Sequence, residues 1–237
     1  LVMHRQHLDE VVLSKLDLPS EQEPDLSSLQ AFVDKVKNPK RTIDIALVGK
    51  YTELPDAYKS ICESFIQAGA VNDCKVKLHY VNSEKIDASN VGEKLGKMAG
   101  ILVAPGFGNR GIEGKIEAVH FARTHRIPFL GICLGMQCAV IEFACNVLGF
   151  KDATSTEMDP ATKHPVIDLM EEQKGITAKG GTMRLGAYPC SLVPGSKAAQ
   201  AYGTTQIQER HRHRYEFNNS FKEAYEAAGM KCVGINP

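Results

Sequence analysis

The sequence has no net charge, no long apolar run and no C-x-x-C pair, and each of these absences excludes a class of protein. Lysine plus arginine and aspartate plus glutamate both number 28, so no general electrostatic attraction to nucleic acid or to an anionic membrane is expected. No apolar run approaches the roughly 20 residues of a membrane-spanning helix, and no charged-then-apolar segment opens the chain. We therefore expect a soluble, cytoplasmic protein.

The seven cysteines are an odd number and are scattered along the chain. Such a set argues against a disulfide framework and against a zinc ribbon, and no metal site is expected. Most of these thiols fit an ordinary role as small buried apolar side chains. The absence of paired cysteines favours a reducing compartment.

Strand-like and helix-like segments alternate through the first two thirds of the chain. Strands are expected at 43–48, 75–82, 101–106 and 127–132, and helices at 56–71, 91–100, 112–125 and from 134 onward. Asp56 is expected to cap the first of these helices. The strands expected at 101–106 and 127–132 are apolar throughout, which is typical of parallel strands covered on both faces. The expected fold class is α/β, with a mostly parallel open sheet flanked by helices.

The two ends of the chain depart from this alternation. Two short helices are expected before the first strand, at 7–19 and 25–38, because prolines follow each of them. Beyond residue 151 the pattern loosens into connections rich in Thr, Pro and Gly. The chain is expected to close with a strand at 213–218, a helix at 220–230 and a strand at 231–236.

Cys133 follows the strand expected at 127–132, and open α/β sheets gather their functional groups at such strand ends. The sequence GICLG at 131–135 matches the cysteine form of the nucleophile elbow, G-x-C-x-G. Glycines two residues before and after the nucleophile let the backbone approach closely at this tight turn. The first N–H groups of the following helix would favour a thiolate and an oxyanion. We therefore interpret Cys133 as a catalytic nucleophile.

A glycine-rich segment, APGFGNRGIEGK, occupies residues 104–115. From Gly106 onward it copies the G-x-G-x-x-G spacing of a dinucleotide-binding loop, but 124–133 holds no acidic residue to bind a ribose. The remaining alternatives are a plain tight turn and a loop whose backbone N–H points at a carbonyl attacked by Cys133. We favour this oxyanion-hole loop over the turn and over the nucleotide site.

Histidines and arginines alternate in QERHRHRYEFN, residues 208–218. A single strand would place His211, His213 and Tyr215 on one face and Arg210, Arg212 and Arg214 on the other. No third metal ligand of suitable spacing is evident, and no basic field surrounds the segment to bind nucleic acid. Arginines near a cysteine cleft are suited to hold a substrate carboxylate through paired N–H donors. A solvated edge strand is the alternative.

Together these features resemble the glutaminase domains of the CTP synthase family, which are of the class I glutamine amidotransferase type. The matching motifs are IALVGKYT, GFGNRGIEGK, PFLGICLGMQ, NVLGF, STEMDP, GGTMRLG and ERHRHRYE. They lie in the order of the family between residues 43 and 216. The resemblance implies a flavodoxin-like glutaminase domain at 41–237 and a helical linker at 1–40. This linker would lead to a synthetase domain that is absent from the chain.

The resemblance also implies hydrolysis of L-glutamine to glutamate and ammonia, which the synthetase domain would use to aminate UTP to CTP. Cys133 would form a γ-glutamyl thioester, and Gly106 and the backbone of Leu134 would supply the oxyanion hole. The implied substrate-binding residues are Gln137, Glu157, Arg212, Arg214 and Tyr215, the last two through their backbone. Glu157 would bind the substrate ammonium and Arg212 its α-carboxylate.

The sequence contains no G-x-x-x-x-G-K-[ST] loop, so no cofactor is expected in this domain. ATP and Mg²⁺ are expected only in the synthetase domain. The expected partners are L-glutamine and that domain, within a homo-oligomeric full-length protein.

Two features depart from the pattern of the family. Pro105 replaces a glycine of the usual P-G-G-F-G, which removes one N–H and leaves Gly106 as the donor. No H-P-E motif, the family's source of the general base and its orienting acid, occurs in the sequence. We expect the chain to be truncated and this His and Glu to follow Pro237, since Cys133 would be poorly activated without them. Two alternatives stay open: an inactive glutaminase-like binding module, and a cysteine hydrolase acting on another γ-glutamyl or peptide substrate.

Overall fold

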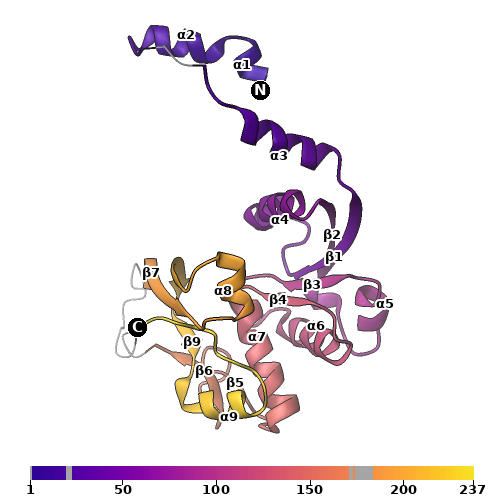
Figure 1. The fold of residues 1–237 in the computed structure, drawn as a ribbon. Coiled ribbons are helices and arrows are strands. Elements are labelled where there is room, and N and C mark those ends of the chain that lie inside the picture. Colours follow the sequence, from indigo (N-terminus) through magenta and orange to yellow (C-terminus); the bar gives the residue numbers. More distant parts are fainter. Residues whose placement is uncertain (1, 20–22, 171–172, 174–183) are drawn as a thin grey trace. The chain divides into compact units, whose positions relative to one another are not determined.

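The computed structural model describes residues 2–19, 23–170, 173 and 184–237 (Figure 1). The chain divides into two compact units. One comprises Leu1–Asp44 and Pro55–Leu78, and the other comprises Ile45–Leu54 and His79–Pro237. Within the described ranges, every helix is too short or too polar to span a bilayer.

The first unit is mainly helical. Its helices are α1 (Val2–Arg5), α2 (Leu8–Lys15), α3 (Ser27–Lys37) and α4 (Lys59–Val71), and α3 packs on α4. The two helices expected before the first strand are therefore confirmed. The expected helix cap at Asp56 is wrong, because Pro55–Tyr58 forms a 3₁₀ turn and Tyr58 occupies the N-cap position of α4.

A four-stranded sheet with the order β2-β1-β3-β4 forms the centre of the α/β fold. The strands are β1 (Arg41–Gly49), β2 (Cys74–Asn82), β3 (Gly100–Val103) and β4 (Phe129–Gly131). β1 runs parallel to β3, with Ile45 opposite Gly100, and β3 runs parallel to β4, with Ile101 opposite Phe129. All four residues of β3 are buried, as its unbroken apolar sequence predicts. The predicted α/β class with a parallel sheet is confirmed.

The helices α5 (Val91–Leu95), α6 (Ile112–Thr124) and α7 (Leu134–Phe143) belong to the second unit. α6 and α7 contact each other, and both lie against β3 and β4 (Figure 1). One apolar core joins the strands to these helices, and its strand residues are Ala46, Val48, Ile101 and Val103. α5 ends at Leu95, five residues earlier than expected at 91–100.

The C-terminal part builds two further three-stranded sheets. One contains β5 (Thr154–Ser155), β6 (Pro165–Leu169) and β9 (Tyr215–Phe217), and the other β10 (Gly234–Ile235), β7 (Arg184–Leu192) and β8 (Gln206–His213). Helices α8 (Lys197–Tyr202) and α9 (Lys222–Ala227) complete this part. The strand expected at 213–218 is confirmed as β9, with the narrower bounds Tyr215–Phe217. The single strand considered over 208–218 is wrong, because the chain bends at Arg214 and β8 and β9 join different sheets.

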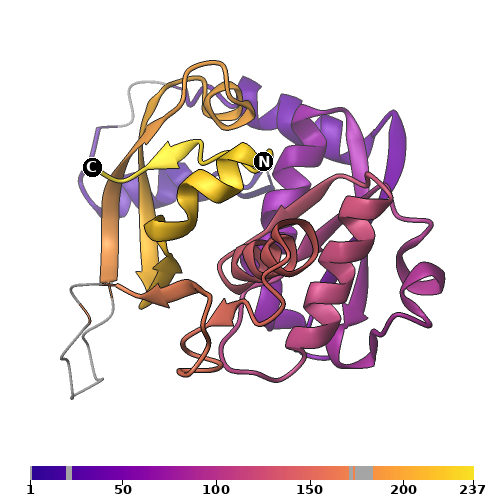
Figure 2. The ribbon, with the colours of Figure 1, turned by 90° about the horizontal axis from the view of Figure 1, so that it is seen from below.

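Helix α7 is shared by two apolar cores. Leu134 and Cys138 belong to the core of the parallel sheet, whereas Val140 and Ile141 belong to a second core with β6 and α9. Figure 2 shows α7 between α6 on one side and the yellow C-terminal segment on the other. The Tyr225 hydroxyl of α9 donates a 2.7 Å hydrogen bond to the Val140 carbonyl and so links the second core to the helix.

Candidate active site

Cys133 occupies the junction between β4 and α7 in a backbone conformation of positive φ, with φ 53° and ψ −111°. A non-glycine residue held in such a conformation stores about 1–3 kcal/mol of strain. Hydrogen bonds on both sides hold it there: Ile132 N–H donates to Val103 O at 3.1 Å and Gln137 N–H donates to Cys133 O at 3.1 Å. The thiol is half-buried. This is the strained strand-to-helix turn that the G-x-C-x-G pattern predicts.

The two glycines of the pattern are required by close backbone contacts. A Cβ at Gly131 would lie 2.5 Å from the Gly135 carbonyl carbon, and a Cβ at Gly135 would lie 2.1 Å from Val103 O. Both distances are shorter than any side chain permits, so the elbow can form only with glycine at these two positions.

A small pocket of about 150 Å³ opens beside Cys133. Its lining residues are Gly106, Phe107, Cys133, Gln137, Glu157, His213, Arg214 and Tyr215. It thus brings together the expected nucleophile, the expected oxyanion donor and most of the expected substrate-binding residues. Leu134 does not line it but lies next to it, since its Cδ2 atom would be 3.5 Å from a Cβ at Gly106.

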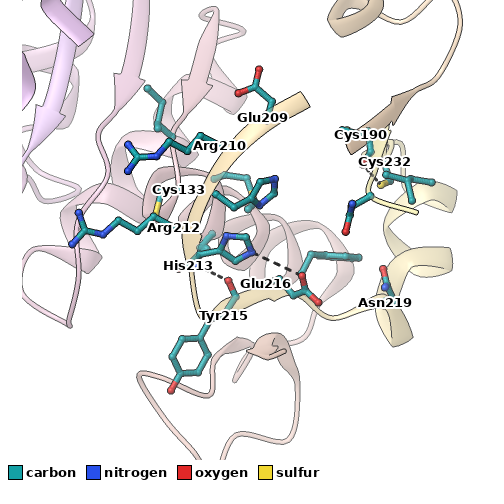
Figure 3. Close-up of a pocket in the computed structure, with 18 of the residues that line it drawn as sticks. Cys133, Cys190, Glu209, Arg210, Arg212, His213, Tyr215, Glu216, Asn219 and Cys232 are labelled. Atoms are coloured by element: carbon teal, nitrogen blue, oxygen red, sulfur yellow. Dashed lines mark hydrogen bonds and ion pairs between the residues drawn. The ribbon is translucent and has the colours of Figure 1, made fainter. Parts of the chain in front are cut away.

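A larger cavity of about 760 Å³ also borders Cys133 and is shown in Figure 3. It is lined by Arg212, whereas the small pocket is lined by Arg214. The structure therefore places Arg212 and Glu157, the expected binding pair for a zwitterion, on different cavities. In Figure 3, Cys133, Arg212 and His213 lie on the opposite side of the cavity from Cys190 and Cys232.

Hydrogen bonds connect the backbone between β8 and β9 to α7 and to the segment that follows β6. Gln137 is buried, and its side-chain amide donates to the Tyr215 carbonyl at 3.4 Å. The Arg214 carbonyl accepts a bond from Met170 N–H, and the Arg214 guanidinium donates to the Gln173 side chain at 2.9 Å. Burial, and then the negative charge of Glu157, raises the pKa of Tyr215. Gln137 thus fixes one wall of the pocket in addition to facing it.

A sequence profile of the family Glutamine amidotransferase class-I matches residues 53–236. The chain belongs to this family. It is 63% identical over its whole length to a CTP synthase of Cytophaga hutchinsonii and 60% identical to a CTP synthase of Bacteroides thetaiotaomicron. The chain spans 44% of the length of each of these relatives.

Among solved structures, this amidotransferase chain is similar to a Trypanosoma brucei CTPS glutaminase domain with bound acivicin. The TM-score is 0.77 and the sequence identity is 35%, and the match covers 82% of this chain and 75% of the other. The resemblance stated from the sequence motifs is therefore confirmed. Of those motifs, the first four residues of GGTMRLG, 180–183, lie outside the described residues.

Two buried lysines of the amidotransferase fold were missed in the sequence. Lys115 Nζ donates a 2.8 Å bond to the Ala104 carbonyl, and Lys50 Nζ donates to the Phe107 carbonyl. Burial lowers the pKa of Lys115 to about 8. A signal was present, because Lys115 falls on the apolar stripe of α6 with Ile112 and Val119 at helical spacing.

His213 was considered only as a metal ligand, yet it lines both cavities with Cys133. Its ring lies 4.9 Å from that of His211, as expected for one strand face, and its Nε2 lies 4.0 Å from a Glu216 carboxylate oxygen. Tyr215 belongs to another strand, so the three side chains do not lie along one strand as expected. Within the described ranges, no three His, Cys, Asp or Glu side chains are grouped to hold a metal ion.

Proposed function

We propose that this chain is the glutaminase domain of a CTP synthase and hydrolyses L-glutamine to glutamate and ammonia. The observation that carries the proposal is the strained Cys133 at the N-terminus of α7, which faces a pocket with a glycine backbone, an acid and an arginine. The family membership and the similarity to a CTPS glutaminase domain support it.

The pocket residues suggest how glutamine is oriented. We assign the substrate ammonium to the Glu157 carboxylate. For the α-carboxylate, the resemblance points to Arg212, but the pocket geometry favours Arg214, because Arg214 lines the same small pocket as Glu157. The Gln173 side chain orients the Arg214 guanidinium. The two charges of the substrate would then be bound within one pocket and would point its side-chain amide toward Cys133.

The chemistry proceeds through two acyl transfers. The Cys133 thiol gives its proton to a base, and the sulfur attacks the amide carbon of glutamine. Gly106 N–H and Leu134 N–H would donate to the developing oxyanion, since an N–H in the first turn of a helix has no intrahelical partner. The C–N bond then breaks, and the leaving nitrogen takes up the proton and departs as ammonia. Water attacks the γ-glutamyl thioester, releases glutamate and restores the thiol.

We place the base in a His–Glu pair outside these 237 residues, in keeping with the absence of an H-P-E motif. The ammonia would pass to a synthetase domain for the amination of UTP, with ATP and Mg²⁺ bound there and no cofactor in this domain. α2 and α3 would link to that domain, since they expose apolar side chains, among them Val11, Val12 and Phe32. The full-length protein would be a homo-oligomer.

Mass spectrometry tests the proposal directly. The full-length protein is incubated with acivicin, a glutamine-like electrophile, and the adduct is located by peptide mapping. One adduct on Cys133, absent in Cys133→Ala and prevented by excess glutamine, is the expected result. Labelling spread over several of the seven cysteines would contradict a glutamine-directed nucleophile. An unlabelled protein without glutaminase activity would favour the alternative of an inactive binding module.

The assignment of the α-carboxylate has its own test. Arg214→Lys is expected to raise the KM for glutamine at least about 10-fold, because a lysine cannot form the paired N–H contact with a carboxylate. Arg212→Lys is the matched control and is expected to change KM by less than about 3-fold. A larger rise in KM for Arg212→Lys than for Arg214→Lys would assign the α-carboxylate to Arg212 instead.

A further inference from the structure

Two buried lysines converge on the loop that carries the proposed oxyanion donor. Lys50, just after β1, is 7% exposed, and Lys115, in α6, is fully buried. Their ammonium groups bond the carbonyls of Phe107 and Ala104. These two carbonyls bracket the short segment formed by Pro105 and Gly106.

The burial of Lys115 has an energetic cost that local structure does not explain. An ammonium group is strongly destabilised in an apolar core, and this cost usually calls for a carboxylate partner. Among the described residues, the side chains that affect the pKa of Lys115 electrostatically are Cys138, Lys50 and Cys133. None of them is a carboxylate, and Lys50 carries a like charge. An apolar residue at this position would fit the apolar stripe of α6 at lower cost.

The position of Gly106 shows what the two lysines enclose. A Cβ at Gly106 would lie 3.4 Å from Lys50 Cε, 3.6 Å from Lys115 Nζ and 3.5 Å from Leu134 Cδ2. Gly106 is therefore bounded by both lysines and by the first residue of α7. Pro105 has no N–H, so it can anchor the loop only through its carbonyl.

We propose that Lys115 and Lys50 are positioning residues for the proposed glutaminase reaction: they hold the backbone of 104–107 so that Gly106 N–H faces the oxyanion. The inference rests on the proposed function. An oxyanion donor is effective only when it is fixed in place before the charge develops. One ammonium group binds a carbonyl at each end of the segment, and each ammonium has three N–H donors with which to hold the backbone in place.

The test compares Lys115→Met with the exposed-lysine control Lys85→Met in the full-length protein. Removing a whole oxyanion donor costs about 10²–10³-fold in kcat, so a misplaced donor is expected to cost about 10–100-fold with KM changed less than about 3-fold. Lys50→Met acts on the other end of the segment and is expected to lose a similar factor. The Lys85→Met control is expected to keep kcat within about 2-fold.

A second readout separates positioning from general damage to the elbow. Alkylation of Cys133 by iodoacetamide forms no oxyanion, so its limiting rate at high pH is expected to match the parent protein in both variants. A kcat within 2-fold of the parent in both variants, a loss confined to KM, or an equal fall in the alkylation rate would overturn the inference. A parent protein that does not hydrolyse glutamine would instead refute the proposed function.

Discussion

Replacement of Lys115 by methionine is expected to stabilise the fold while it impairs the reaction. Lys115 is fully buried, and burial lowers its pKa from 10.5 to about 8. At about 1.4 kcal/mol per pH unit, this difference corresponds to about 3 kcal/mol against the charged form in the folded state. Loss of the charge-assisted hydrogen bond to Ala104 O costs about 2 kcal/mol. Lys115→Met is therefore expected to raise the free energy of unfolding by about 1 kcal/mol at pH 7.

The sign of this effect depends on pH. Below about pH 8, Lys115 is protonated in the folded and unfolded states, and the full cost of burial is present. Between about pH 8 and 10.5 the folded state loses the proton while the unfolded state keeps it, so the contribution of Lys115 to the stability of the parent protein rises with pH. The advantage of Lys115→Met should disappear over this interval.

Urea unfolding followed by far-ultraviolet circular dichroism at pH 7 and pH 10 measures both quantities. The difference between variant and parent cancels the titration of all other groups, and Lys85→Met is expected to stay within about 0.5 kcal/mol of the parent. A Lys115→Met protein that is less stable than the parent at pH 7, or a difference that does not change with pH, would refute the reasoning. Lys115 would then be a structural residue whose burial is compensated elsewhere.

Three further predictions concern the elbow and its helix. Gly135→Ala is expected to lower the free energy of unfolding by at least about 3 kcal/mol, because its Cβ would lie 2.1 Å from Val103 O; near-parental urea stability would contradict the tight turn. Cys133→Gly is expected to be about 1 kcal/mol more stable in thermal unfolding than Cys133→Ala, since glycine adopts φ 53° without strain. Both variants are expected to be inactive. A Cys133→Ala protein more stable than Cys133→Gly would show that the backbone is not strained. Glu142→Ala is expected to lower the free energy of unfolding in urea by about 3 kcal/mol, because the fully buried carboxylate accepts three hydrogen bonds from the Arg123 guanidinium. A loss below about 1 kcal/mol would show that the fold does not depend on this pair.

The parallel sheet and the tight turn that carries Cys133 could be predicted because both depend on short local patterns. Continuous apolar runs produce strands such as β3, whatever the rest of the chain does. The elbow needs only two small residues at fixed spacing, and the contacts at Gly131 and Gly135 show why no other residue suits those positions. These parts of the fold therefore follow from sequence with little reference to tertiary structure.

The division of the C-terminal part into two small sheets could not be predicted, because several of its strands are too short to show a period. β5 and β10 have two residues each, and β9 has three. The bend at Arg214 depends on the bond that its carbonyl accepts from Met170, a partner more than 40 residues away in the sequence. Without that contact, 208–218 is indistinguishable from one long strand, and Arg212 could not be separated from Arg214 as a pocket residue. Lys115 was missed for a related reason, since the carbonyl that it binds is identified only by the fold.

The shared position of α7 has a consequence for how the thiol can be controlled. Its side chains belong to two cores, so the helix cannot shift or fray without opening both of them. Cys133 therefore lies at the start of a helix whose local unfolding is expected to require nearly as much free energy as unfolding of the whole unit. A change in the reactivity of the Cys133 thiol is therefore expected to leave this helix in place and to come from the segments that face it, namely the loop at 104–107 and the chain between β8 and β9.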